Sequence, residues 1–375
     1  MKTKLNFKLN ILNSSWGVSL LSAVAAILIG LLFGFIILLI SNAKEAVPGF
    51  IAILQGGFSD GAKGIGDVLY NATPIILTGL SVGFAFKTGL FNIGASGQFT
   101  MGAYAAIFIG IKWTFLPGHL HWIVALLGAI AAGALWGLLP GILKAFTNVH
   151  EVISSIMMNY IGMYTVNMLI VDNIHDKIKN QSLPVAKTAI LPKAGLEKIF
   201  ETNNMNIGII IAILAVIVIF IILQKTTFGY ELKACGLSPT ASKYAGINAK
   251  RNIILSMVIA GALSGLGGGL LYLAGSGKYL QVVDILAPQG FNGISVALLG
   301  MSHPIGILFA GLFIGHLTVG GVNIQLYSFV PEVIDIIIAV IIYCGAFALL
   351  FKNIIMKFNK RVTKEEAGKW TQYTF

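Results

Sequence analysis

Long apolar runs recur along the whole chain, and they restrict its possible folds more than any other feature. A helix needs about 20 residues to cross a bilayer, and only helices or closed barrels satisfy their backbone groups in lipid. The runs predict an all-α integral membrane protein with about ten transmembrane helices. The predicted crossings are 17–41, 67–86, 89–111, 121–143, 155–171, 206–223, 253–274, 288–302, 304–323 and 333–351. The eighth depends on a break at Ser302-His303-Pro304, so nine crossings is the alternative.

Composition and the distribution of charge support this class. Of the 375 residues, 57% are hydrophobic and 10% are charged, against roughly 25% charged in soluble domains. With a cytoplasmic N-terminus, the predicted inside segments hold 16 Lys and Arg and four acidic residues, and the outside segments hold nine and ten. Cytoplasmic loops of membrane proteins are enriched in Lys and Arg. We therefore predict a multi-pass cell-membrane protein with both termini in the cytoplasm. Its basic charge would contact lipid headgroups and not nucleic acid.

This topology divides the chain into a cytoplasmic segment (1–16), a transmembrane domain (17–351) and a basic cytoplasmic tail (352–375). An external loop spans 172–205, and the largest cytoplasmic loop spans 224–252. The first apolar run is longer than the 7–15 residues of a signal-peptide core. It therefore predicts a retained first helix.

A polar, glycine-rich stretch, FNIGASGQFTMGAY, begins at Phe91 inside this apolar sequence. Asn92, Ser96 and Gln98 would lie within the bilayer, where an unsatisfied polar group costs several kcal/mol. These side chains must therefore face protein or water. One interpretation is close helix packing with polar side chains between the helices, and the other is the lining of a solute pathway. Asn159, at depth in the fifth crossing, is a further pathway candidate.

Two short motifs indicate internal symmetry. FNIG (91–94) stands at the start of the third crossing, and FNGI (291–294) at the start of the eighth. Five crossings from an inside start end outside, so a second set of five would be inverted. Gly-interrupted helices at matching places in inverted halves are typical of transport pathways. Asn292 and Ser295 would then lie opposite Asn92 and Ser96.

The basic loop contains the second informative stretch, TTFGYELKACGLSPTASKYAGINAKR (226–251). Ser238 followed by Pro239 has the N-cap and N1 chemistry of a short helix, which Gly246 can end. A capped helix on the cytoplasmic face is suited to a groove on a partner. The alternative is a helix that lies on the membrane surface.

Two further motifs concern local structure. Asn148 and Glu151 have capping-box spacing and predict the start of the fifth helix, and GALSGLGGG (261–269) has the small-residue spacing of helix packing. The chain has no HExxH motif, no cysteine cluster and no carboxylate pair at membrane depth. We therefore predict that it is not an enzyme.

Four segments carry a resemblance to a known family: GLFNIGASGQ (89–98), HEVISSIMMNYI (150–161), FGYELKACGLSPTASKYAGI (228–247) with the following GALSGLGG, and GISVALLGMSHPIG (293–306). In this order they are similar to permease subunits of bacterial ABC importers of the ribose and branched-chain amino-acid permease superfamily. Within it, the chain resembles the nucleoside and simple-sugar group served by basic-membrane-protein-type lipoproteins.

The resemblance implies ten or so helices in two inverted halves in the bacterial cell membrane. It also implies three partners: a related but different second permease subunit, an ABC ATPase subunit that uses ATP and Mg²⁺, and an extracellular substrate-binding lipoprotein. This chain itself would bind no cofactor. Family members often have an acidic residue at the position of Ser96 and an asparagine at that of His150, so the carry-over of a particular solute is open at these positions.

The resemblance also assigns residues. The ATPase-coupling segment would contain Gly229, Leu237, Ser238, Pro239, Ala241, Tyr244, Ala245 and Gly246. The substrate pathway would be flanked by Phe91, Asn92, Ser96, Gln98, Asn159, Asn292 and Ser295. The predicted function is ATP-driven import of a neutral polar solute, with nucleosides favoured. The alternatives are a simple-sugar or other small-solute ABC permease and a stand-alone secondary transporter.

Overall fold

A computed structural model describes residues 15–347 and residue 357. The ends of the chain outside these residues include most of the predicted N-terminal segment, the last residues of the tenth crossing and the predicted tail 352–375 apart from residue 357. The contact pattern divides the chain into two units. One combines Met1–Ile51 with Ile324–Phe375, and the other is Ala52–Asn323. Each unit is described by itself.

In the first unit, α2 (Ser15–Ser41) packs along α15 (Pro331–Ala346). Small residues on α2 permit the contact, because a β-carbon at Gly30 would lie 2.6 Å from the Ile341 Cα atom. This unit also contains η3 (Ile324–Tyr327) and the first residues of α3 (Ala46–Gln55). The helix α3 was not predicted from the sequence.

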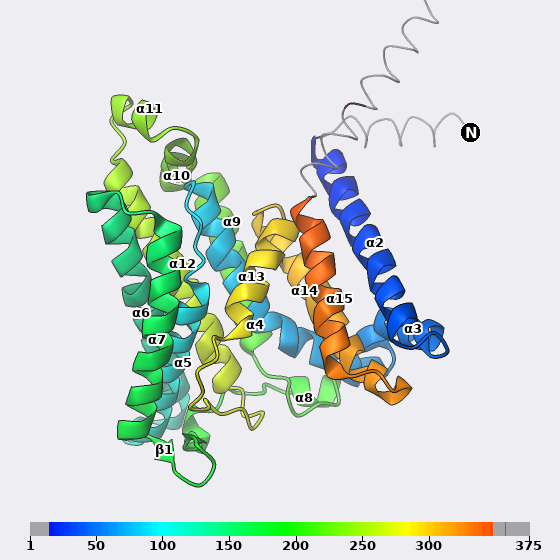
Figure 1. The fold of residues 1–375 in the computed structure, drawn as a ribbon. Coiled ribbons are helices and arrows are strands. Elements are labelled where there is room, and N and C mark those ends of the chain that lie inside the picture. Colours follow the sequence, from blue (N-terminus) through cyan, green and yellow to red (C-terminus); the bar gives the residue numbers. More distant parts are fainter. Residues whose placement is uncertain (1–14, 348–356, 358–375) are drawn as a thin grey trace, which may run out of the picture. The chain divides into compact units, whose positions relative to one another are not determined.

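The second unit contains most of the helices (Figure 1). In chain order they are η1 (Gly56–Phe58), α4 (Gly61–Lys87), α5 (Ala95–Lys112), α6 (Gly118–Thr147), α7 (Glu151–Asn173), η2 (Lys187–Ala189), α8 (Leu196–Ile199), α9 (Gly208–Lys225), α10 (Thr227–Leu237), α11 (Pro239–Tyr244), α12 (Ala249–Tyr272), α13 (Pro288–Leu299) and α14 (Pro304–Asn323). One small antiparallel sheet pairs β1 (His175–Asp176) with β2 (Gln181–Ser182). The helix α4 is buried along most of its length and forms the centre of this unit.

Each of the ten predicted crossings overlaps a described helix, and six described helices are long and apolar enough to span a membrane: α2, α4, α6, α9, α12 and α14, the last with η3. The number of ten crossings, the inverted halves and the cytoplasmic termini remain predictions. The predicted break at Ser302-His303-Pro304 is confirmed, because α13 ends at Leu299 and α14 begins at Pro304. The predicted start of the third crossing at residue 89 is wrong. The chain turns at Gly89, whose φ is +73°, and α5 begins only at Ala95.

The predicted capping box at the start of α7 is also wrong. The N-cap is His150, whose Nδ1 atom accepts a hydrogen bond from the Val152 N–H at 3.4 Å. Asn148 instead ends α6 in a left-handed conformation. Glu151 forms an ion pair with Lys144 of α6 at 3.0 Å, so its carboxylate joins two helices instead of closing a cap.

The predicted packing role of 261–269 is confirmed by the contact between α6 and α12. A β-carbon at Gly133 would lie 2.8 Å from the Gly265 Cα atom and would also collide with the Gly261 carbonyl oxygen. The backbones of the two helices therefore touch, which small residues at four-residue spacing allow. This contact holds α6 on α12, and α12 in turn contacts α4 and α5.

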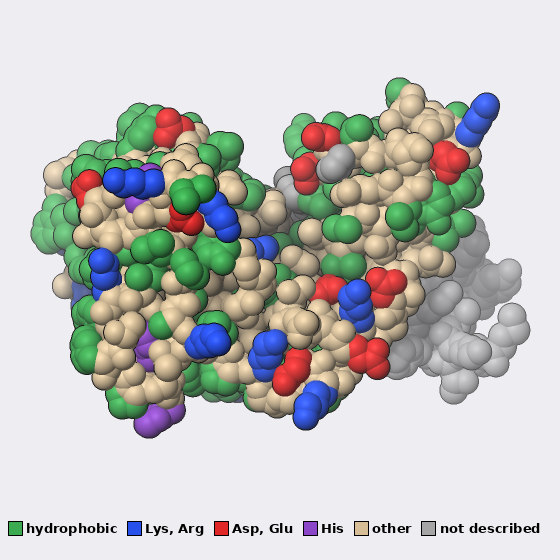
Figure 2. All heavy atoms as spheres, turned by 90° about the horizontal axis from the view of Figure 1, so that it is seen from below, with side chains coloured by type: hydrophobic (Ala, Val, Ile, Leu, Met, Phe, Trp, Pro, Cys, Tyr) green, Lys and Arg blue, Asp and Glu red, His purple; other side chains and the backbone are tan. Residues whose placement is uncertain are grey.

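The two ends of this unit have different structures. At one end, the loop 172–205 meets the segment 273–287: the Ser182 N–H donates to the Leu280 carbonyl at 2.8 Å, and the Leu191 N–H to the Leu273 carbonyl at 2.9 Å. Figure 2 looks onto this end and shows acidic and basic side chains interspersed there. At the opposite end lie α10 and α11 (Figure 1).

Candidate functional site

The predicted pathway residues lie around a turn, residues 88–94, that joins α4 to α5. Asn92 is fully buried, and its Nδ2 donates to Gln98 Oε1 at 2.9 Å and to Ser81 Oγ at 3.0 Å. Gln98 Nε2 donates back to Asn92 Oδ1 at 3.1 Å. The two amides therefore satisfy each other, and Ser81 ties them to α4.

Asn159 of α7 closes the other side of this turn. Its Oδ1 accepts a hydrogen bond from the Gly97 N–H at 2.8 Å, and its Nδ2 donates to the Ile93 carbonyl at 3.0 Å. Gly97 is the third residue of α5, and the first N–H groups of a helix have no partner within it. Since the Gly94 N-cap provides no side-chain hydrogen bond, Asn159 caps α5 from another helix.

Ser96 faces the start of α13. Its Oγ donates to the Ala287 carbonyl at 2.9 Å, and Gly290 lies directly against the Ser96 backbone. Thr78 of α4 donates similarly to the Gln289 carbonyl at 2.9 Å. The Ser96 and Thr78 hydroxyls therefore donate to backbone carbonyls just before α13 and in its first turn. Gly290 permits the close approach of α13 to the start of α5.

The two FN motifs lie near each other at this junction. Phe91 and Ile294 pack against one apolar cluster, which consists of Val82, Ala95 and Ala297. Ser295 is buried, and its hydroxyl donates to the Phe291 carbonyl of its own helix at 3.3 Å. Asn292 is half-buried. The predicted pathway residues thus come together, and in this conformation hydrogen bonds within the protein occupy most of their polar groups.

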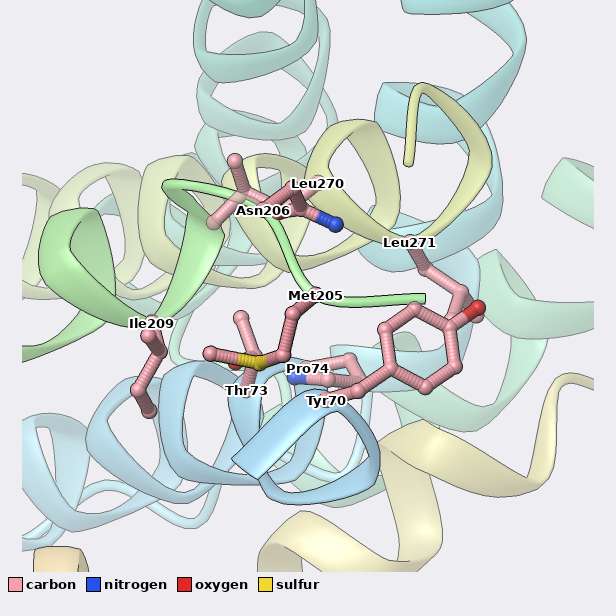
Figure 3. A pocket seen from close by; sticks show the side chains of 8 residues that line it. All are labelled: Tyr70, Thr73, Pro74, Met205, Asn206, Ile209, Leu270 and Leu271. Atoms are coloured by element: carbon pink, nitrogen blue, oxygen red, sulfur yellow. The ribbon is translucent and has the colours of Figure 1, made fainter. Parts of the chain in front are cut away.

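A small cavity lies elsewhere, between α4, α9, α12 and the chain before α9 (Figure 3). Its volume is about 10 Å³, roughly the room that one water molecule needs. The lining residues are Tyr70, Thr73, Pro74, Met205, Asn206, Ile209, Leu270 and Leu271. None of them was predicted as a site residue, although an aromatic residue near the outer end of a predicted crossing could have drawn attention to Tyr70.

A polar cluster surrounds the ring and hydroxyl of Tyr70. Its hydroxyl is 2.6 Å from Ser276 Oγ, and Lys278 Nζ lies over the ring at 5.3 Å from the centroid. Burial lowers the pKa of Lys278. A cation over an aromatic face is attracted by the ring, so this contact fastens the loop 273–287 to α4.

The predicted coupling segment forms two helices, α10 and α11. Ser238 is the N-cap of α11 and its Oγ accepts from the Ala241 N–H at 3.2 Å, Pro239 is at the first position, and Gly246 follows with a φ of +78°. The predicted short helix is therefore confirmed. Tyr244 and Leu237 are 90% and 89% exposed, which is unusual for large apolar side chains. Ala241, Ala245 and Gly246 are exposed beside them. Gly229 is not on this surface, because it is buried against the backbone of α9.

The end of α10 contacts the turn 88–94. A β-carbon at Gly236 would lie 2.5 Å from the Lys87 carbonyl oxygen and 2.9 Å from the Gly89 nitrogen. The last turn of α10 therefore lies directly on the backbone that precedes Asn92. Thr88 Oγ1 also donates to Ser256 Oγ of α12 at 2.8 Å. The last turn of α10, which directly precedes α11, thus contacts the backbone of the turn that contains Asn92.

In the part of the chain that the structure describes, no group of three or more His, Cys, Asp or Glu side chains could hold a metal ion. Six described helices that are long and apolar enough to cross a membrane, together with a buried polar cluster, are typical of an integral membrane protein. The chain belongs to the family described as the branched-chain amino acid transport system / permease component, which matches residues 64–346.

Individual relatives agree with this assignment. The guanosine ABC transporter permease protein NupP of Bacillus subtilis is 40% identical over 343 residues, which cover 91% of this chain and 97% of the relative. The nucleoside ABC transporter permease protein NupB of Lactococcus lactis is 36% identical, over 91% of this chain and 95% of the relative. The guanosine ABC transporter permease protein NupQ of Bacillus subtilis is 30% identical over 71% of this chain and 84% of the relative. No solved structure matches the chain significantly.

Proposed function

We propose that the chain is the membrane-spanning permease subunit of an ABC importer that moves nucleosides into the cell. The observation that carries this proposal is its similarity, over 91% of its length, to two permeases named for guanosine and nucleoside transport. Similarity over nearly the whole of both chains includes the coupling segment and the buried polar cluster together. An uncharged cluster of amides and hydroxyls also suits a neutral polar solute better than an ion.

The proposal includes three partners. Bacillus subtilis has two different guanosine permease relatives of this chain, which supports a second, related permease subunit. An ABC ATPase subunit would bind ATP and Mg²⁺, and an extracellular lipoprotein would deliver the solute. This chain would hydrolyse nothing.

The coupling surface, formed by the end of α10 and by α11, would dock on the ATPase. Leu237 and Tyr244 are large, apolar and almost fully exposed, and a helix with such anchors is suited to a groove on a partner. The residues Ser238, Pro239, Ala241, Ala245 and Gly246 would shape and flank this contact. Because Gly236 lies on the backbone of Lys87 and Gly89, movement of α10 and α11 would displace the turn 88–94.

That displacement would open the pathway. In this conformation Asn92 and Gln98 bind each other, and Ser96 binds the chain before α13. A shift of the turn would separate these pairs and free their polar groups for the solute. Asn159, Asn292 and Ser295 would then flank the same path.

The test is uptake of radiolabelled guanosine by proteoliposomes that contain the complete complex with its ATPase. ATP on the side of the membrane where the ATPase lies should drive guanosine uptake. Tyr244→Ala should abolish both this uptake and the co-purification of the ATPase. Phe115→Ala is the matched control, because Phe115 is 76% exposed and follows α5 between α5 and α6, far in sequence from the coupling segment. ATP-independent uptake by the isolated chain would contradict the proposal and favour a secondary transporter.

A further inference from the structure

The hydroxyl of Ser155, on α7 beside the turn 88–94, differs from the other polar groups at this junction. The side chain is fully buried, and among the described residues its Oγ atom has no hydrogen-bond partner. An unpaired polar group away from water costs free energy, and the large majority of buried side-chain polar atoms in proteins are paired. The Ser155 hydroxyl is therefore an exception that needs a physical explanation.

The neighbours of Ser155 show how α7 satisfies its other buried polar groups. Asn159, one helical turn after Ser155, uses both ends of its amide on backbone groups of the turn and of α5. Ser154, the preceding residue, donates to the Glu151 carbonyl of its own helix at 3.1 Å. Both side chains stabilise this conformation, whereas the Ser155 hydroxyl contributes no hydrogen bond to it.

Ser155 lies next to the two buried amides. A β-carbon at Gly94 would lie 3.3 Å from the Ser155 Cβ atom, 3.3 Å from Asn92 Oδ1 and 3.4 Å from Gln98 Nε2. Polar side chains from the turn, from α5 and from α7 therefore meet around one glycine. The backbone at Gly94, with a φ of −71°, would accept a side chain, but that side chain would fill the space between the three polar groups.

The three groups around Gly94 have hydrogen-bonding capacity to spare. Asn92 Oδ1 accepts from Gln98 Nε2 at 3.1 Å, and an amide oxygen has a second lone pair while an amide nitrogen has a second N–H. A serine hydroxyl can both donate and accept. Since none of the three is charged, they suit an uncharged group that donates and accepts, and their close spacing favours a small one.

We propose that Ser155, together with Asn92 and Gln98, binds a ribose hydroxyl of the transported nucleoside. This inference rests on the proposed function and adds the residues that recognise the sugar. A hydroxyl is one small group that donates and accepts at once, whereas the edge of a base presents several polar atoms in a row. In this conformation even a β-carbon at Gly94 would touch all three neighbours, so the solute binds after the turn 88–94 has moved.

The unpaired hydroxyl also links solute binding to that movement. A ligand shifts a conformational equilibrium only through interactions that differ between the two states. The hydrogen bond from Ser155 to the solute exists in the occupied state alone, so it favours that state directly. A hydroxyl that was already paired in the resting state would have to lose one hydrogen bond to form another.

Transport kinetics of the complete complex test the contact. Ser155→Ala should raise KM for guanosine uptake by about 2- to 13-fold, the range that corresponds to one neutral hydrogen bond, with a smaller change in kcat. Ser154→Ala is the matched control, because Ser154 is a buried serine on the same turn whose hydroxyl binds its own helix. It should leave KM nearly unchanged. Gly94→Ala fills the space beside Ser155 and should raise KM at least as much as Ser155→Ala does.

Deoxynucleosides test whether the bound group is a ribose hydroxyl. The 2′-, 3′- and 5′-deoxy analogues of guanosine compete with labelled guanosine for uptake, and each gives a ratio of inhibition constants relative to unlabelled guanosine. For the analogue that lacks the contacted hydroxyl, this ratio should be about 2- to 13-fold smaller with Ser155→Ala than with the native complex. Any preference of the extracellular subunit enters both complexes alike and cancels in this comparison.

Unfolding of the purified chain separates recognition from structure. Because an unpaired hydroxyl contributes no hydrogen bond, Ser155→Ala should unfold at the same SDS concentration as the native chain or at a higher one. A raised KM together with unfolding at a lower SDS concentration would assign the hydroxyl a structural role and overturn the inference.

The remaining outcomes separate this inference from the proposed function. An unchanged KM for Ser155→Ala, or equal ratios in both complexes for all three deoxynucleosides, would overturn the inference and leave the importer assignment intact. No guanosine uptake by the unmodified complex would overturn the proposed function and, with it, the assignment of Ser155 to a ribose hydroxyl.

Discussion

Asn159→Ala removes a side chain that serves two backbone groups at once. In the native protein, the Asn159 amide accepts from the Gly97 N–H and donates to the Ile93 carbonyl, and it is 1% exposed. Alanine would leave both backbone groups buried without a partner. Each buried polar group that loses its partner costs about 1–3 kcal/mol, so the variant should lose about 2–6 kcal/mol in the free energy of unfolding. Entry of a water molecule into the space left behind would place the loss at the lower end of this range.

The assay is SDS titration of the purified protein in mixed micelles, with the helical circular dichroism signal as the readout. Asn173→Ala is the control on the same helix. Asn173 is exposed and donates to the Leu169 carbonyl one turn away, so its loss should change the free energy by about 0.5 kcal/mol or less. If both variants lose the same small amount, Asn159 does not cap α5 and the hydrogen-bonded description of the turn 88–94 is incorrect.

Two further substitutions test contacts between backbones. Gly133→Val would place its side chain against Gly261 of α12 and should lower the free energy of unfolding by at least about 1–3 kcal/mol, as overpacking does. Gly118→Val is the control, because the nearest neighbouring atom is 3.5 Å from its β-carbon. This variant should leave the thermal unfolding temperature nearly unchanged. Equal unfolding temperatures for both variants would refute the close packing of α6 on α12. Gly236→Val would press on the Lys87 carbonyl and should lower guanosine uptake while the ATPase still co-purifies. Unchanged uptake would show that a displacement of α10 is not transmitted to the turn 88–94 through this contact.

The start of α5 shows where hydropathy fails as a guide. Leu90, Phe91 and Ile93 are apolar, so the third predicted crossing was extended back to residue 89. The chain instead turns at Gly89, and these residues are held by contacts with α4, α7 and α13. Whether a short apolar segment continues a helix or forms a turn depends on partners that lie far away in the sequence.

The polar cluster shows a second limit. Composition and depth predicted that Asn92, Ser96 and Gln98 must be satisfied by protein or water, and the structure places these three side chains and that of Asn159 in hydrogen bonds within the protein. The identity of the partners was beyond prediction, since Ser96 binds a carbonyl 191 residues away. Their place in the solute pathway is still a prediction, because these contacts describe one conformation.

The two tyrosines of α7 show that helical spacing does not reveal which face of a helix is exposed. The sequence places Tyr160 and Tyr164 one turn apart in a helix, but a stripe with this spacing can face lipid, another helix or a solute. Only the position of Asn159 and Trp136, which hold the other face of α7, shows that the tyrosines point away from the unit.

The sequence by itself determined that the chain is a helical membrane protein, where most helices lie, and that a capped helix begins at Ser238. These features depend on local chemistry: the length of apolar runs, the missing N–H of Pro239 and the capping oxygen of serine. The tertiary structure alone decided that Gly236 rests on the backbone of the turn 88–94, that Asn159 caps α5, and that α7 exposes its tyrosines. Such contacts join residues from distant parts of the chain, and their geometry depends on how whole helices pack, which no local pattern encodes.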